Sequence, residues 1–213
     1  EQQELERLLP IIEAIKQRFD IIISVDSSSP QVMLEGAKRG IGLINDVRAL
    51  QREGALQAAA NTQLPVCLMH MQGQPATMQV QPVYQSVIDE VKAFLQQRIA
   101  ACMAQGIGSE RIVLDVGFGF GKTLAHNLQL LAGLAQFQDL GCPLLVGMSR
   151  KSMLGAILNG APVDKRLFAG VSAATIAAIN GARIIRTHDV QATKEALAVV
   201  SALIALGENN NVA

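Results

Sequence analysis

The stretch that decides the fold runs from 112 to 123 and reads Ile-Val-Leu-Asp-Val-Gly-Phe-Gly-Phe-Gly-Lys-Thr. Its first three residues form an apolar run that predicts a buried strand, and Asp115 stands at the end of that strand. The loop that follows alternates glycine with other residues, carries two phenylalanines and lets other groups approach its backbone closely. A strand that ends in a carboxylate and opens such a loop predicts a binding site.

Five further apolar runs predict strands, and helical patterns lie between them. The predicted strands are 19–26, 41–46, 65–70, 111–115, 143–147 and 183–187. The predicted helices are 4–18, about 30–40, 53–61, 83–103, 127–137, 167–181 and 194–206, with a polar loop at 71–81 and a frayed end at 209–213. No linker rich in Pro, Gly or Ser interrupts this alternation. It therefore predicts a single α/β domain over residues 1–213, built on a parallel sheet.

Polar residues follow every one of the six predicted strands. They are Asp26, Asn45 with Asp46, His70, Asp115, Ser149 with Arg150 and Lys151, and Arg186 with His188. In an open doubly wound sheet only a few strand ends carry chemistry, whereas in a TIM (β/α)8 barrel every strand ends at the same mouth. The pattern therefore favours a TIM-type barrel. Because the chain carries about six of the eight strands and begins with a helix, we expect the first strands of the barrel to be absent.

Composition limits the kinds of partner and compartment. The 213 residues are 50% apolar and carry a formal net charge of zero, which disfavours nucleic acid as a partner. The sequence has no signal-peptide pattern, and its longest apolar stretches are too short or too interrupted to span a bilayer. Three cysteines without metal-ligand spacing predict buried, reduced thiols and a cytoplasmic protein.

The glycine loop resembles two nucleotide-binding motifs and fits neither. A Walker A loop requires glycine where this chain has Val116, although Gly121, Lys122 and Thr123 match its end. The interval between the last two glycines is also wrong for a dinucleotide fingerprint. We therefore interpret the loop as part of a different kind of site.

Each candidate site residue also has a structural explanation. Asp115 could cap a helix or lie in a solvated turn, Asp26 and Asn45 could be turn residues, and Met69 could pack in the core. The basic runs Ser149–Ser152 and Arg186-Thr187-His188 could form a solvated face. If these groups instead meet at strand ends, two acids, an amide and several cations suit a small heterocyclic ligand with an anionic tail.

Six motifs in order resemble the bacterial dihydropteroate synthases over the whole chain. They are ISVD at 23–26, LIND at 43–46, CLMHMQG at 67–73, LDVGFGFGK at 114–122, GMSRKS at 147–152 and IIRTHD at 184–189. The resemblance implies a (β/α)8 barrel, usually a homodimer, that condenses dihydropterin-CH2-pyrophosphate with 4-aminobenzoate in folate synthesis. It also implies a bound Mg²⁺ and inhibition by sulfonamides.

The resemblance assigns a role to each matching residue. Asp26, Asn45 and Asp115 would hydrogen-bond the pterin ring, with Lys151 at its carbonyl side, while Met69 and Arg186 would pack against its faces. Arg186 and His188, in the run that includes Thr187, would hold the pyrophosphate. Phe120, Lys151 and Ser152 would border the aminobenzoate pocket. Asp26, Lys151, Arg186 and His188 would act in catalysis, Asp26 by offsetting the positive charge that develops on the pterin methylene.

The chain departs from the family pattern in two ways. Val116 stands where the family usually has proline, and the chain lacks the family's first two strands, including an asparagine that binds Mg²⁺. If the chain is complete, we expect little or no turnover with pterin binding retained. Two alternatives stay open at this point: a methyltetrahydrofolate methyltransferase-like barrel, and a non-catalytic pterin-binding remnant.

Overall fold

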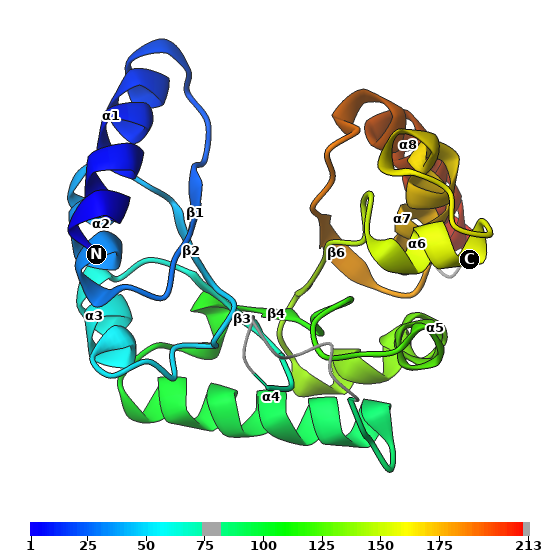
Figure 1. The fold of residues 1–213 in the computed structure, drawn as a ribbon, viewed down its shortest axis with the longest axis horizontal. Coiled ribbons are helices and arrows are strands. Elements are labelled where there is room, and N and C mark those ends of the chain that lie inside the picture. Colours follow the sequence, from blue (N-terminus) through cyan, green and yellow to red (C-terminus); the bar gives the residue numbers. More distant parts are fainter. Residues whose placement is uncertain (74–81, 211–213) are drawn as a thin grey trace. The chain divides into compact units, whose positions relative to one another are not determined.

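The computed structural model describes residues 1–73 and 82–210, so most of the predicted loop at 71–81 and the last three residues lie outside it. Strands and helices alternate along the described chain, as predicted (Figure 1). The strands are β1 Ser24–Asp26, β2 Leu43–Asp46, β3 Val66–Met69, β4 Ile112–Asp115, β5 Leu144–Val146 and β6 Ala182–Ile185. The α-helices are α1 Gln2–Arg18, α2 Pro30–Lys38, α3 Ala55–Thr62, α4 Val87–Ala104, α5 Leu124–Ala132, α6 Ser152–Ile157, α7 Leu167–Ile179 and α8 Val190–Asn210.

The chain forms two compact units. The first unit comprises Glu1–Met71, Asp89–Asp115 and Leu140–Cys142. The second comprises Gln72–Ile88, Val116–Asp139 and Pro143–Ala213. Since both units are assembled from separate stretches of sequence, neither corresponds to one segment of the chain, and the single domain stays a prediction.

The first unit is built on four parallel strands. β1 pairs with β2, β2 with β3, and β3 with β4. Every residue of β3 and β4 is buried, which is the burial expected of parallel strands covered on both faces. Helices α1, α2 and α3 lie beside one another next to β1 and β2 (Figure 1).

Two predicted helix signals of the first unit are confirmed. The Ser29 hydroxyl accepts a hydrogen bond from the Val32 N–H, and Pro30 occupies the first helical position of α2. Gly40, just past the end of this helix, has φ +81°, a conformation that favours glycine. The turn at Gly40 connects the end of α2 at Lys38 to the start of β2 at Leu43.

Three predictions about helices and strands are wrong in detail. Residues 19–23 were expected in a buried strand, but β1 begins at Ser24 and the Ile22 side chain is 82% exposed. The described partner of β1 is β2, on one side of the strand, so an apolar sequence there is not sufficient for burial. The helix predicted at 83–103 begins at Val87, and the side chains of Val83 and Met103 are largely exposed. The short helix α6 was not predicted.

The second unit contains the remaining two strands. β5 and β6 are parallel, with an irregularity in register at Leu144 and Leu145. Helix α7 packs against β6 and against α8, and it buries the small residues Ala173, Ala174 and Ala177. Small side chains allow close approach of the helix backbone to its neighbours. Among the described helices of both units, none has the length and apolar character needed to cross a bilayer.

Candidate functional site

Four predicted site residues of the first unit lie on one face of its sheet. The register pairs Asp26 with Asn45, Asn45 with Cys67, and Cys67 with Val113. Met69 and Asp115, which pair with each other, come two residues after Cys67 and Val113 on the same strands. Because side chains two residues apart on a strand share a face, Asp26, Asn45, Met69 and Asp115 project to the same side. The predicted position of Asp26, Asn45 and Asp115 at the ends of their strands is confirmed, and their role in binding stays a prediction.

Asn45 is a buried polar residue with an unsatisfied donor. Asn45 is only 3% exposed, and its side-chain Nδ2 has no hydrogen-bond partner among the described residues. An unpaired buried amide costs about 1–3 kcal/mol. The amide therefore provides a vacant donor on the face that also carries two carboxylates.

Asp46, the next residue, is one of the polar residues predicted at the strand ends, and it holds the loop after β2. It is fully buried, and its Oδ1 accepts hydrogen bonds from the Ser28 hydroxyl and from the Arg48 N–H at 2.9 Å. Its Oδ2 accepts from the Leu50 N–H at 2.8 Å. Strand alternation points Asp46 away from Asn45, so the carboxylate serves the loop and the amide serves the shared face.

The other residues of this face differ in burial. Asp115 is 2% exposed and Met69 is 1% exposed, whereas Asp26 is exposed and borders a groove with Glu4 and Arg7. The main-chain N–H of His70 donates to the Asp115 carbonyl at 2.9 Å. The His70 ring stacks edge-on against Phe94, as expected for a buried histidine at a strand end.

The second unit carries the glycine loop. Gly117, Gly119 and Gly121 all have positive φ, so the backbone follows a path that other residues rarely adopt. Phe118 is completely buried, while Phe120 is partly exposed. Phe118 is therefore part of the core of the second unit, and Phe120 is the more accessible of the two phenylalanines.

Lys151 contacts this loop at two points. Its Nζ donates to the Phe118 carbonyl and lies 4.7 Å from the centroid of the Phe120 ring, a cation–π distance. Lys151 immediately precedes α6, whose first residue is the exposed Ser152. The structure thus brings together Phe120 and Lys151, two of the residues predicted to border the aminobenzoate pocket.

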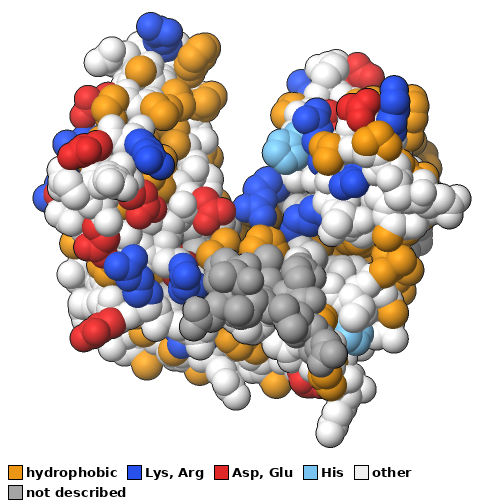
Figure 2. All heavy atoms as spheres, in the orientation of Figure 1, with side chains coloured by type: hydrophobic (Ala, Val, Ile, Leu, Met, Phe, Trp, Pro, Cys, Tyr) orange, Lys and Arg blue, Asp and Glu red, His pale blue; other side chains and the backbone are white. Residues whose placement is uncertain are grey.

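Arg186 and His188 follow β6 on an exposed loop. A Cβ added at Gly147 would lie 2.9 Å from the Arg186 Nε, so the guanidinium lies directly over the backbone of Gly147. The His188 N–H donates to the Ser149 hydroxyl at 3.2 Å. Figure 2 shows Lys and Arg side chains close to a histidine on the second unit. Arg186 and His188 thus both lie on the exposed surface of the second unit.

Arg150 and Asp189 join the loops after β5 and β6. The Arg150 guanidinium donates to both carboxylate oxygens of Asp189, at 2.6 and 3.2 Å. Arg150 has φ +60°, a strained conformation for a residue with a side chain. Its hydrogen bonds hold the pKa of Asp189 below the ordinary value. Sequence analysis had assigned no role to Asp189.

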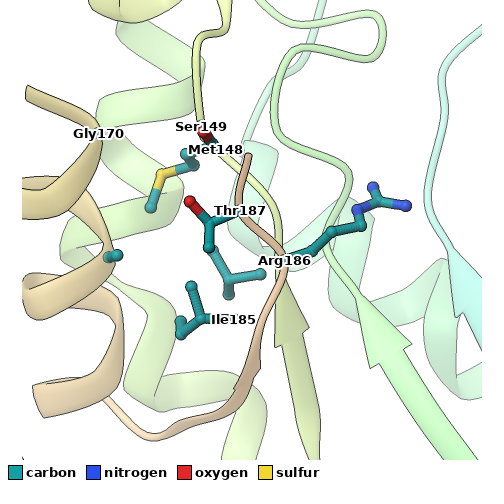
Figure 3. A pocket seen from close by; sticks show the side chains of 8 residues that line it. Met148, Ser149, Gly170, Ile185, Arg186 and Thr187 are labelled. Carbon is teal, nitrogen blue, oxygen red and sulfur yellow. The ribbon is translucent and has the colours of Figure 1, made fainter. Parts of the chain in front are cut away.

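Thr187 lies differently from its neighbour Arg186. Its side chain lines a pocket of about 10 Å³, enough for one water molecule, together with Met148, Ile185 and Gly170. Figure 3 shows Arg186 pointing away from this pocket. The Thr187 hydroxyl is 3.1 Å from that of Thr193 and accepts from the Asp189 N–H. Its described contacts are thus with the protein, and its predicted contact with substrate stays a prediction.

The described residues contain no group of three or more His, Cys, Asp or Glu side chains that could hold a metal ion. They therefore do not form a cage for Mg²⁺. Magnesium commonly binds through one or two carboxylates together with substrate phosphates. The Mg²⁺ that the family resemblance implies therefore stays a prediction.

A family profile and individual relatives place this chain in the same protein family. The profile of the family described as pterin binding enzyme matches residues 1–188. The dihydropteroate synthase of Escherichia coli K12 is 54% identical over 208 residues, which cover 98% of this chain and 73% of that protein. The dihydropteroate synthase of Haemophilus influenzae is 52% identical over 199 residues, covering 93% of this chain and 72% of that protein.

Solved structures agree with this result. Yersinia pestis dihydropteroate synthase in a complex with a sulfonamide drug has a TM-score of 0.94 and 52% identity, covering 97% of this chain and 75% of that one. The Xanthomonas albilineans enzyme in complex with 7,8-dihydropteroate has a TM-score of 0.89 and 43% identity, covering 96% of this chain and 77% of that one. The predicted TIM-barrel fold class, with about six of the eight strands in this chain, is confirmed.

Proposed function

This chain belongs to the pterin-binding enzyme family and, within it, to the dihydropteroate synthases, and from this we propose how its residues perform the reaction. The enzyme is a transferase. The proposed substrates are 6-hydroxymethyl-7,8-dihydropterin pyrophosphate and 4-aminobenzoate, and the products are 7,8-dihydropteroate and pyrophosphate.

The unpaired amide of Asn45 is the observation that carries the proposal. It lies on the same face as Asp26 and Asp115, so an amide donor and two carboxylate acceptors face one ligand. A pterin ring presents N–H and amino groups to carboxylates, and a ring nitrogen or carbonyl to an amide N–H. Met69, on the same face, supplies a polarizable thioether suited to the flat surface of the ring.

The residues of the second unit suit the other parts of the reaction. Arg186 and His188 are exposed cationic or ionisable groups, and we propose that they bind the pyrophosphate. Lys151 and Phe120, in contact with each other, would form one wall for the aromatic ring of 4-aminobenzoate, with Ser152 beside them.

The proposed chemistry needs no protein nucleophile. The bond between the pterin methylene carbon and the pyrophosphate oxygen breaks, and pyrophosphate leaves with the electron pair. The amino nitrogen of 4-aminobenzoate attacks that carbon and then loses a proton. Arg186 and His188 would stabilise the charge on the leaving group, and Asp26 would offset the positive charge on the methylene.

Magnesium, compartment and oligomeric state are further parts of the proposal. Mg²⁺ would be bound largely through the pyrophosphate of the substrate. A reducing, cytoplasmic location is supported by three cysteines that are buried and form no disulfide among the described residues: Cys67, Cys102 and Cys142. A homodimer is supported by apolar side chains exposed on α7 and α8, among them Ile179 and Val199, each 62% exposed. Light scattering would show a mass of two chains if this surface forms a dimer.

The test of the function is pyrophosphate release from the two substrates, alongside calorimetric titration of the pterin. We expect pterin binding, condensation and competition by sulfonamides with 4-aminobenzoate. A second chain, extended at its N-terminus, is assayed in parallel. Tight pterin binding without pyrophosphate release in both chains would contradict the proposed reaction and leave a pterin-binding role.

A further inference from the structure

Lys122 is a buried lysine in the glycine loop, and the mechanism above does not use it. It is 3% exposed, which is rare for a lysine. Its Nζ donates to the Gly117 carbonyl at 2.9 Å and to the Phe120 carbonyl at 3.0 Å. The ammonium group is thus directed into the loop, where it binds backbone oxygens.

These two carbonyls belong to opposite ends of one tight turn. The Phe120 N–H also donates to the Gly117 carbonyl, at 3.1 Å. Lys122 therefore closes the turn around Phe118 and Gly119 from the inside. A charged donor makes stronger hydrogen bonds than a neutral one, so this contact fixes the turn more firmly than the backbone bond alone.

Side chains from other segments bind four further carbonyls of the loop, those of Phe118, Gly121, Lys122 and Thr123. The Tyr84 hydroxyl donates to the Gly121 carbonyl at 2.8 Å. Asn127 Nδ2 donates to the carbonyls of Lys122 and Thr123, and Asn127 Oδ1 accepts from the Gly119 N–H. Lys151 binds the Phe118 carbonyl. The loop is thus a closely held structure.

The loop also has little room to adopt another path. A Cβ at Gly119 would lie 3.2 Å from Cδ of Lys151, and one at Gly121 would lie 2.4 Å from the Gln72 carbonyl oxygen. Within this packing, the turn closed by Lys122 decides where the Phe118 carbonyl and the Phe120 ring lie. Both of those groups contact Lys151.

We propose that Lys122 is a positioning residue for the second-substrate pocket: its ammonium holds the turn that presents the Phe118 carbonyl and the Phe120 ring to Lys151. This inference rests on the proposed function, which assigns that wall to 4-aminobenzoate. It predicts an effect on one substrate only. Recognition of the pterin ring by Asp26, Asn45 and Asp115 does not depend on this turn.

The test replaces Lys122 by methionine, which keeps much of the length and removes the donors. Two affinities are measured by calorimetry: that of 6-hydroxymethylpterin alone, and that of 4-aminobenzoate with 6-hydroxymethylpterin, pyrophosphate and Mg²⁺ present. For Lys122→Met we expect about tenfold weaker binding of 4-aminobenzoate and pterin affinity within about twofold of wild type. The matched control is Lys165→Met, a lysine that is 72% exposed, and we expect neither affinity to change.

Equal losses of both affinities, or no loss, would overturn the positioning role. If Lys122→Met does not fold, Tyr84→Phe decides, since it removes only the hydroxyl that binds the Gly121 carbonyl. A selective, smaller loss for 4-aminobenzoate supports the inference, and unchanged binding overturns it. Failure of the wild-type chain to bind 4-aminobenzoate at all would instead contradict the proposed function, and with it the basis of this inference.

Discussion

Asn45 and Asp46 are neighbours at the end of β2 with opposite tasks. Strand alternation separates their side chains to the two faces of the sheet. The Asp46 carboxylate is occupied by Ser28 and by two backbone N–H groups, whereas the Asn45 Nδ2 has no partner among the described residues. One residue therefore stabilises the fold and the other is available for a ligand.

This contrast predicts different effects for two adjacent substitutions. Asn45→Leu removes no described protein hydrogen bond, so its unfolding free energy should stay within about 1 kcal/mol of wild type or rise. Its affinity for 6-hydroxymethylpterin should fall at least about tenfold. Asp46→Ala should lower the unfolding free energy by about 2–4 kcal/mol, because it leaves buried donors unpaired. Urea unfolding and calorimetry measure both quantities, and a destabilised Asn45→Leu with normal pterin affinity would contradict the assignment.

At the scale of the element, the glycine loop is predicted to resist substitution more than an ordinary turn. Gly121→Ala places a Cβ 2.4 Å from the Gln72 carbonyl oxygen at φ +62°. Gly106 has φ +80° but nothing within 4 Å of its added Cβ, so Gly106→Ala is the matched control. We expect Gly106→Ala to cost about 1 kcal/mol from backbone strain and Gly121→Ala about 1–3 kcal/mol more. Equal costs in urea unfolding would mean that the Gln72 contact does not restrict the loop.

The Arg150–Asp189 pair, which links the loops after β5 and β6, predicts a pH dependence. Hydrogen bonds from Arg150 lower the pKa of Asp189 in the folded protein below its ordinary value of 3.8. The stability that the carboxylate contributes is therefore fully present above the ordinary pKa and is lost as the pH falls through the folded value. The difference in unfolding free energy between wild type and Asp189→Asn should be constant above about pH 5 and shrink in acid. If the difference in unfolding free energy does not change with pH, the Arg150–Asp189 ion pair is not its cause.

The strands and helices were largely predictable from the sequence, whereas the contacts that their side chains make were not. Apolar runs that end in polar residues located all six strands, because parallel strands are buried along their length. The exposed start of the 19–26 run could not be foreseen, since burial depends on which strands cover it. The buried position of Lys122 was also hidden: nothing in a Gly-Lys-Thr sequence specifies that its ammonium binds carbonyls of its own loop. Tyr84, which is 37 residues away from Gly121, could be placed beside it only by the structure.

At the scale of the whole molecule, burial of all three cysteines predicts a protein that is inert to thiol reagents while folded. Burial is the main cause that raises the pKa of the Cys102 thiol to about 11 from an ordinary 9.0, which lowers its thiolate fraction about 100-fold at pH 8. We expect no thiol to react with 5,5′-dithiobis(2-nitrobenzoate) in the native protein within minutes, and all three to react in urea. Rapid labelling of one native thiol would show that a unit opens locally.

The shared face of Asp26, Asn45, Met69 and Asp115 has a consequence for how the length of this chain can change in evolution. These strands are three or four residues long, and their side chains alternate between faces. A single inserted residue within β3 would rotate Met69 to the opposite side, whereas an insertion in a loop outside the strands would leave the alternation intact. Two inserted residues would restore the face but move the side chain along the strand. Substrate recognition and strand alignment are thus tied together, so we expect length differences among related sequences to be confined to the connections between strands and helices.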